Sequence, residues 1–381
     1  MFFYIGEHTS LLNKIQPGLF LDDGWNFKSD NTNSFWSKGY STECNIHDSF
    51  IDIINGYVPR GLWTVIHYNG IEYKVYHSLL RGYPLYFKDK EVTNLPNLKD
   101  FQRHINVPEV SLNDDPLSLD EAVNQIQNIL EENILGFHQY NDARLNVLFS
   151  GGLDTVIVWA LIDKLSIPYD FDVSISNIKS PELLKALGRI REYETPLTEH
   201  ISKNVWSYEI TSLRKNINWY STGFYSEIMT LRSMPAFAII AGYYNKTVYD
   251  FISESDYVYS FLQRKRDIFD KVYNAPVDEI SLKERLVKMI FSDYQMWHID
   301  NNFHFSPFYD IRIAQVAYRL SIDDLIVNSR HGTIQRMIIE RTNPQLLKLV
   351  SDKKNTGNVM LNFMRNLATI KFPKDTKKTF R

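Results

Sequence analysis

The sequence is poor in cysteine, in long apolar runs and in net charge, and each shortage excludes a class of protein. One cysteine among 381 residues, Cys44, excludes an internal disulfide framework and a CxxC metal or redox site. Cys44 and His47 have the spacing of half a zinc site, but no second pair exists. No apolar run approaches the ~20 residues that span a bilayer. A formal net charge of −3 gives no general attraction to nucleic acid or anionic membranes. We therefore expect a cytoplasmic protein without a membrane partner, and a nucleic-acid partner is disfavoured.

The first part of the chain has the composition of a β-rich domain. Hydrophobic residues make up 44% of the sequence and charged residues 23%, as in globular proteins with a sizeable core. Short β-type runs such as GLWTVIHY and IEYKVYHSLL are separated by Asn69-Gly70, which favours a hairpin. We predict a mostly β domain over residues 1–112.

The second part, residues 113–381, alternates between strand and helix patterns. Ser118-x-x-Glu121 is a capping box that opens an amphipathic helix. A buried strand is predicted at 145–149, an alternating strand at 170–175 and a third strand at 247–252. Helices are predicted at 155–165 and 234–244, with mainly helix beyond residue 267. This alternation predicts a parallel sheet with helices on its faces, and so an α/β fold.

The stretch LNVLFSGGLDTVIVW, residues 145–159, predicts a phosphate site between a strand and a helix. Two glycines let the backbone approach an anion, and the helix start supplies free N–H groups. The hydroxyls of Ser150 and Thr155 can donate to phosphate oxygens, and Asp154 can hold Mg²⁺. The loop lacks the Gly-Lys-Ser/Thr of a Walker A motif. It therefore indicates a nucleotide with its metal, and the alternative is a simple turn with an aspartate near the helix start.

The SGGLDT letters resemble the PP-loop of ATP pyrophosphatases, which split ATP into AMP and pyrophosphate while they adenylate a substrate. Several subfamilies share this loop, so other stretches must distinguish them. Four of them, in the correct order, resemble the asparagine-synthetase group: GYVPRGLWTVIHYNGIEYKVYHSLLRGYPLYFKDKE from residue 56, YDFISESDYVYS from 249, SPFYDIRIAQVAYRLS from 306 and SDKKNTG from 351. The chain is therefore similar to a member of that group, with a degenerate glutaminase-like domain (N-terminal nucleophile type) before a PP-loop domain.

The resemblance implies a role for each matching position. The ATP phosphates and Mg²⁺ would be bound by Ser150, Gly151, Gly152, Asp154 and Thr155. Asp256 would be a second Mg²⁺ ligand, and Glu254 would be the base for the attacking amine. Lys353 or Lys354 would stabilise negative charge in the adenylation or acyl transfer. Adenine and ribose would lie near Leu148 and Ile175. Asp310 is expected to fix a helix start or turn.

One departure from the group concerns its N-terminal cysteine nucleophile, which this chain replaces with Met1-Phe2. We therefore expect no glutaminase activity, as in the related β-lactam synthetases and lasso-peptide cyclases. The expected function is ATP-dependent, glutamine-independent amide formation between a carboxylate and an amine of small-molecule or peptide substrates. One alternative is an adenylating enzyme that modifies a nucleobase in tRNA or DNA. Another is a non-catalytic scaffold, because serines and a tyrosine replace group residues around Glu254. The oligomeric state stays open, a homo-oligomer included.

Overall fold

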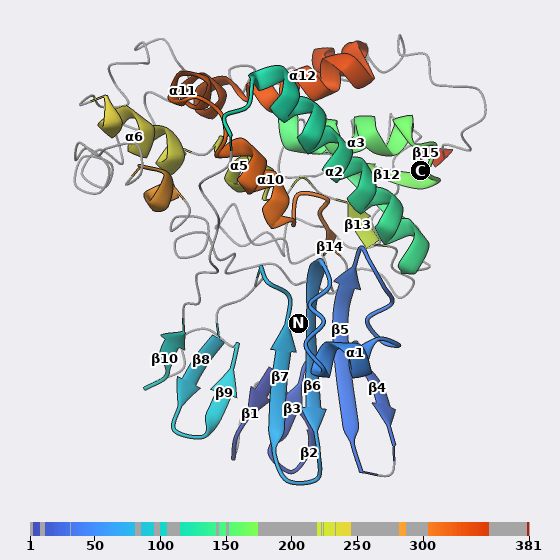
Figure 1. Cartoon of the computed structure of the whole chain (residues 1–381). Helices are drawn as coiled ribbons and strands as arrows, with labels where there is room; N and C mark the ends of the chain where they lie inside the picture. The colour runs from blue at the N-terminus through green and yellow to red at the C-terminus, as the bar shows by residue number, and fades with distance from the viewer. Residues whose placement is uncertain are drawn as a thin grey trace, which may run out of the picture.

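The computed structural model shows a mixed α/β chain, with antiparallel sheets in its N-terminal part and helices later in the sequence (Figure 1). The expected mostly β character of the N-terminal part is confirmed. The structure describes residues 3–7, 12–30, 32–80, 85–94, 100–104, 115–141, 145–149, 152–173, 219–221, 223, 225–232, 234–244, 282–286, 304–349 and 379–380. The predicted boundary between residues 112 and 113 lies outside these ranges.

Two antiparallel sheets form the N-terminal part. The six-stranded sheet has the order β10 (Gln102–His104), β8 (Leu85–Lys88), β9 (Glu91–Thr93), β1 (Phe3–Ile5), β3 (Leu19–Leu21), β2 (Asn13–Gln16). The four-stranded sheet has the order β4 (Asn26–Ser29), β5 (Ser34–Ser41), β6 (Gly61–Tyr68), β7 (Tyr73–His77). Phe3 and Leu19 of the first sheet share one buried cluster with Trp36 and Ile66 of the second. The two sheets therefore pack face to face through their apolar sides.

Strand β6 is covered on both faces, which explains its nearly continuous apolar sequence. Ile66 faces the six-stranded sheet, while Trp63 and Val65 pack with Ile53 of helix α1 (Phe50–Ile54). A strand covered on both sides has no need of a polar face. The hairpin predicted at Asn69-Gly70 joins β6 to β7 and is confirmed.

Helix α2 (Leu119–Tyr140) begins at the predicted capping box. The side chain of Ser118 accepts from the backbone N–H of Glu121, and the glutamate side chain accepts from the backbone N–H of Ser118. The helix is fully buried along one apolar stripe, which comprises Ala122, Val123, Ile126, Leu130, Ile134 and Phe137. This stripe faces the largest hydrophobic cluster of the protein.

A five-stranded sheet lies in the later part of the chain. Its order is β14 (His304–Phe305), β13 (Trp219–Ser221), β11 (Leu145–Phe149), β12 (Tyr169–Val173), β15 (Thr379–Phe380), and each neighbouring pair is parallel. Helix α3 (Leu153–Lys164) follows β11 and packs against α2 and α12 (Thr333–Thr342). The strand predicted at 170–175 is found as β12, which begins one residue earlier at Tyr169, and residues 174 and 175 lie outside the described residues. The strand predicted at 247–252 lies outside the described residues.

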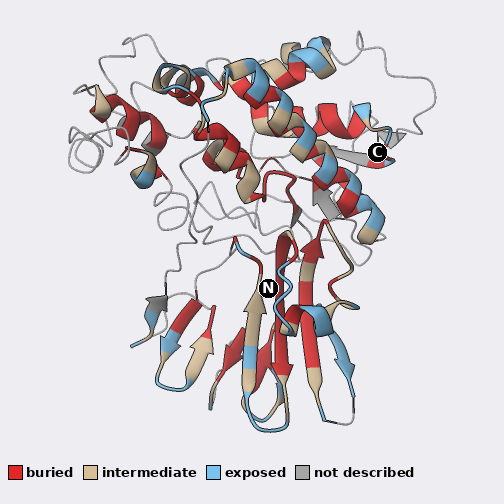
Figure 2. Cartoon of the chain, viewed as in Figure 1, coloured by how far each residue is buried: buried red, intermediate tan, exposed pale blue. Residues whose placement is uncertain are grey.

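Further helices lie in the later part of the chain. They are α5 (Ser226–Met229), α6 (Met234–Tyr243), α10 (Ile311–Ala317), α11 (Ile322–His331) and the 3-10 helix η4 (Pro344–Leu349). They pack on one another and on α2, α3 and α12, and they are buried on much of their surface (Figure 2). In the part of the chain that the structure describes, no helix combines the length and the apolar character needed to cross a bilayer.

The N-terminal sheets and the later helices meet in a contact that contains buried polar groups. The Tyr40 hydroxyl donates to the Ser306 carbonyl at 3.2 Å, and the Tyr309 hydroxyl donates to the Leu80 carbonyl. Burial raises the pKa of both tyrosines, so these hydroxyls stay protonated and remain donors. Asn133 of α2 donates to Asp310 at 3.1 Å. Tyr40 also belongs to the same hydrophobic cluster as α2 and α3, so the two parts share a core.

Candidate nucleotide site at the end of strand β11

The candidate site lies where strand β11 ends and helix α3 begins. Strand β11 has a parallel neighbour on each side. Its Val147 lies opposite Phe171 of β12 on one side and opposite Ser221 of β13 on the other. Gly152 caps the helix in an extended conformation, with φ −85° and ψ 158°. Thr155 Oγ1 donates to the Gly152 carbonyl at 3.1 Å. The first turn of a helix therefore starts at the carboxyl end of an interior strand, where its free N–H groups can face an anion.

Asp154, in this first turn, is held on one side only. Its Oδ2 lies 2.5 Å from Nη2 of Arg232. Its Oδ1 is buried and has no hydrogen-bond partner among the described residues. The two side chains are 21% and 16% exposed, respectively. A carboxylate oxygen out of water and without a donor is costly unless a cation or donor binds there.

The guanidinium of Arg232 also pairs with a second carboxylate. Nη2 lies 3.0 Å from Oε1 of Glu227, and the backbone N–H of Arg232 donates to the Glu227 carbonyl at 2.7 Å. Two negative charges therefore share one arginine, and Arg232 is positioned by the turn that follows α5. The planar fork of arginine suits such a shared arrangement.

Two glycines allow these elements to approach one another. A Cβ on Gly223 would lie 2.3 Å from the carbonyl carbon and oxygen of Asp154, so no other residue fits there without a shift of the backbone. A Cβ on Gly332 would lie 2.7 Å from Cδ of Arg232 and 2.9 Å from Cδ1 of Leu153. Gly332 also has φ +65° at the joint between α11 and α12. Both glycines thus bring distant segments onto the start of α3.

A buried network fixes the segment that carries Arg232. The side-chain amide of Asn328 donates to the Thr230 carbonyl at 2.6 Å, and that of Gln335 donates to Thr230 Oγ1 at 2.7 Å. Tyr225 and Leu231, on either side of α5, have positive φ values of 67° and 56°. Non-glycine residues in this region are strained, and such strain persists where the surroundings hold the backbone. The segment 225–232 is therefore held in place by α11 and α12.

The predicted site residues divide into three groups. Gly152, Asp154 and Thr155 are described and lie together at the turn. Leu148 lies in β11, but its side chain is not among those described. The others, Ser150, Gly151, Ile175, Glu254, Asp256, Lys353 and Lys354, lie outside the described residues. Within the described ranges, no group of three or more histidine, cysteine, aspartate or glutamate side chains could hold a metal ion.

The sequence reasoning missed Arg232, Glu227 and both glycines. Gly332 follows the last turn of a helix, where glycine is a common C-cap, so that signal was available. A single arginine in TLRSMPAF carries no such signal, because its partner is 78 residues away. The expectation for Asp310 is confirmed, since it caps α10 and its side chain accepts from the backbone N–H of Arg312 at 3.0 Å. Comparison with protein-family models and with curated proteins gives no match to this chain.

Proposed function

We propose that this protein is an ATP-dependent, glutamine-independent amide-forming synthetase of the asparagine-synthetase-like PP-loop type. It would adenylate a carboxylate, release pyrophosphate and transfer the acyl group to an amine. The observation that carries the proposal is the carboxylate of Asp154, in the first turn after an interior strand, with one buried oxygen that has no partner in the described structure.

The surroundings of the turn support the binding of a triphosphate. SGGLDT spans the join between β11 and α3, so its glycines precede a helix N-terminus that favours negative charge. The neighbouring strands on both sides of β11 are parallel, and ligands of such sheets bind beyond the carboxyl ends of the strands. The fold and the motif therefore indicate the same edge of the sheet.

The residues present fit a divalent cation at Asp154. The buried Oδ1 is a hard anionic oxygen of the kind that Mg²⁺ prefers, and the proposed second ligand is Asp256. Bound there, Mg²⁺ would neutralise charge on the pyrophosphate leaving group. Asp154 would hold the Mg²⁺, and the N–H groups of α3 would donate to phosphate oxygens. The hydroxyl of Thr155 would donate to a phosphate oxygen in place of its bond to the Gly152 carbonyl.

Arg232 holds the carboxylate of Asp154 in place. It lies against Asp154 and is itself held by Glu227, so its charge is shared between two carboxylates. We therefore assign Arg232 the positioning of Asp154, while Lys353 or Lys354 would stabilise negative charge in the adenylation or acyl transfer and Glu254 would be the base for the amine.

The location of the only cysteine supports glutamine independence. Cys44 lies in the loop after β5, with its Sγ 3.9 Å from Oγ of Ser41, and it packs against a hydrophobic cluster around Trp63. A cysteine nucleophile of the N-terminal type needs an α-amino group as its base, and Cys44 is an internal residue. We therefore expect no release of glutamate from glutamine.

Pyrophosphate release tests the proposal directly. Wild-type protein with ATP and Mg²⁺ is assayed against separate panels of amino acids, small peptides and tRNA. Release with a carboxylate–amine pair would support amide formation, and release with tRNA alone would overturn it in favour of nucleobase modification. Asp154→Asn should abolish release. Asp120→Asn is the matched control, because Asp120 also lies in a first helical turn and pairs with an arginine, Arg341.

Binding of a non-cleavable analogue separates catalysis from recognition. Calorimetry with α,β-methylene-ATP and Mg²⁺ should give saturable binding that Asp154→Asn weakens by about tenfold or more, because a charged ligand to the metal is lost. No binding to the wild-type protein would refute both adenylating readings and favour a non-catalytic scaffold.

A further inference from the structure

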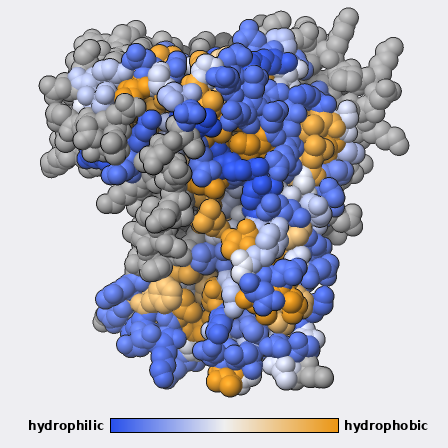
Figure 3. All heavy atoms as spheres, viewed as in Figure 1, coloured by the Kyte–Doolittle hydropathy of each residue, from blue (hydrophilic) through white to orange (hydrophobic). Residues whose placement is uncertain are grey.

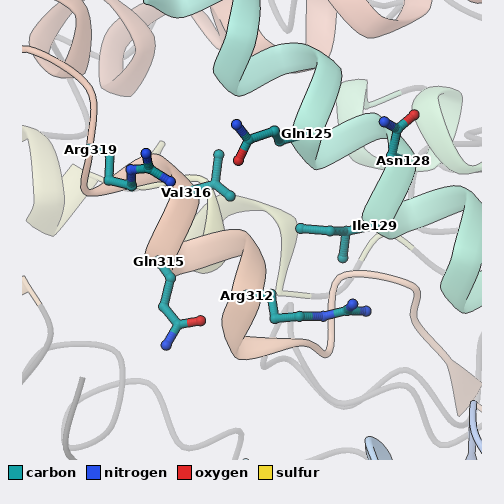
Figure 4. Close-up of a pocket in the computed structure, with 7 residues that line it drawn as sticks. All are labelled: Gln125, Asn128, Ile129, Arg312, Gln315, Val316 and Arg319. Carbon is teal, nitrogen blue, oxygen red and sulfur yellow. The ribbon is translucent and has the colours of Figure 1, made fainter. Parts of the chain in front are cut away.

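A separate groove lies between helices α2 and α10, away from the turn after β11. It has a volume of about 360 Å³, within the range of small-ligand sites. Helix α2 lines it with Gln125, Asn128 and Ile129, and α10 and the turn after it line it with polar residues around Val316 (Figure 4). The surface over these helices is mostly hydrophilic, with a small apolar area between them (Figure 3).

The two arginines of the groove differ in how they are paired. Arg312 donates to both oxygens of Asp310 and to Glu132, so its charge is neutralised. Arg319 donates through Nε to the Asp115 carbonyl at 2.8 Å, and in the described structure no carboxylate lies within ion-pair distance of it. The bond to the carbonyl fixes the guanidinium, and its charge also acts at longer range on the carboxylate of Glu121. Among the described residues its two terminal nitrogens have no hydrogen-bond partner, so they can donate to an anion.

The amides of the groove have no hydrogen-bond partner in the part of the chain that the structure describes. Among the described residues, no hydrogen bond involves the side chains of Gln125, Asn128 or Gln315. In contrast, Gln127 and Asn133 of the same helix donate to Glu131 and Asp310. The side chains of Gln125 and Arg319 extend toward the same space beside Val316 (Figure 4). Val316 and Ile129 supply the apolar surface of this space.

We propose that this groove binds the carboxylate of an acylated amino acid, either as a free molecule or as the C-terminal end of a peptide. Arg319 binds the carboxylate, because a guanidinium matches its two oxygens. The amide of Gln125 pairs with the N–H or C=O of the acyl amide, since it offers both a donor and an acceptor. An apolar side chain of the ligand covers Ile129 and Val316. The site is independent of ATP binding at Asp154.

Calorimetric titration of the full chain with N-acetyl-leucine tests the site. Binding should saturate, and N-acetyl-leucinamide, which lacks the charge, should bind about tenfold or more weakly. Arg319→Gln should weaken N-acetyl-leucine by about the same factor, because the charged partner of the carboxylate is lost. Arg336→Gln is the matched control, because Arg336 likewise donates through Nε to a carbonyl, that of His331, and lies on α12. This control should bind as the wild type does.

A second variant separates recognition from folding. Gln125→Glu places a negative charge beside Arg319 on the helix surface. It should weaken the binding of N-acetyl-leucine more than the binding of the uncharged N-acetyl-leucinamide. The acetylated tripeptide alanyl-alanyl-leucine identifies the source: tighter binding than N-acetyl-leucine assigns a peptide end, and weaker binding assigns the free acylated amino acid. The proposal would be overturned if neither N-acetyl-leucine nor the tripeptide bound saturably, or if N-acetyl-leucinamide bound as tightly as N-acetyl-leucine. It would also be overturned if Arg336→Gln lost as much affinity as Arg319→Gln.

Discussion

The ion pair between Asp154 and Arg232 should couple the two residues more strongly than an ordinary surface pair. The atoms lie 2.5 Å apart and the side chains are 21% and 16% exposed. Between unit charges at ~4 Å, the gross attraction runs from about 1 kcal/mol in water to about 4 kcal/mol in a partly screened site. Desolvation and lost side-chain freedom oppose this attraction. We therefore expect a net coupling energy of about 1–3 kcal/mol.

A double-mutant cycle measures this coupling. Urea unfolding is followed for the wild type, Asp154→Asn, Arg232→Met and the double variant, and the interaction is the departure from additivity. Asp120 and Arg341 form the matched pair, with side chains that are 69% and 29% exposed. Their coupling should stay below about 1 kcal/mol, as for exposed ion pairs. Equal coupling in the two cycles would refute the argument from burial.

The same variants test whether Asp154 accepts a cation. Arg232→Met removes the partner of Oδ2, so neither oxygen of Asp154 then has a partner among the described residues. Added Mg²⁺ should therefore raise the unfolding free energy of this variant more than that of the wild type. A ligand at a hundred times its Kd stabilises the folded state by about 2.7 kcal/mol. The effect should be absent in the double variant, which lacks the carboxylate. Equal stabilisation of all four proteins by Mg²⁺ would place the cation elsewhere.

Three further changes have defined outcomes. Gly223→Ala should destabilise the protein in urea by about 1–3 kcal/mol and weaken binding of the ATP analogue, because its methyl group collides with the backbone of Asp154. Asn133→Ala should cost about 2 kcal/mol of unfolding free energy, since it removes a donor from the buried carboxylate of Asp310; an unchanged midpoint would contradict this. Burial lowers the pKa of His47 from 6.5, so the unfolded chain takes up the proton first. Stability is therefore retained above pH ~6.5 and should fall as the pH drops below it, and His47→Gln should flatten this dependence in unfolding measured across pH.

Local signals in the sequence were sufficient for several elements. The Ser118 box and the Asn69-Gly70 turn each involve residues within a few positions of one another, and both are found where the sequence placed them. The apolar run after Gly152 likewise identified α3, since that helix is buried along almost its whole length. In these cases the residues that form the element lie within a few positions of it in the sequence.

Short strands and long-range pairs could not be derived in the same way. Strands β13 and β14 have three and two residues, too few for a periodic pattern, and they exist because the sheet supplies their hydrogen-bond partners. Arg232 became part of the candidate site only through the fold, which brings residues 223, 232 and 332 together at one helix start. A motif of six letters identifies a loop but not the side chains that other segments bring to it.

The polar network around Thr230 links the candidate site to the helices behind it. Asn328 binds the carbonyl of Thr230 and also accepts from the backbone N–H of Ile334, so it joins α11, α12 and the turn before Arg232. Gly332 sits between these helices, and a Cβ there would collide with the arginine side chain. The position of Arg232 therefore depends on packing about 100 residues further along the chain. Under the proposed function, Asn328→Ala should weaken binding of the ATP analogue although Asn328 would not touch it, and unchanged binding in calorimetry would contradict this coupling.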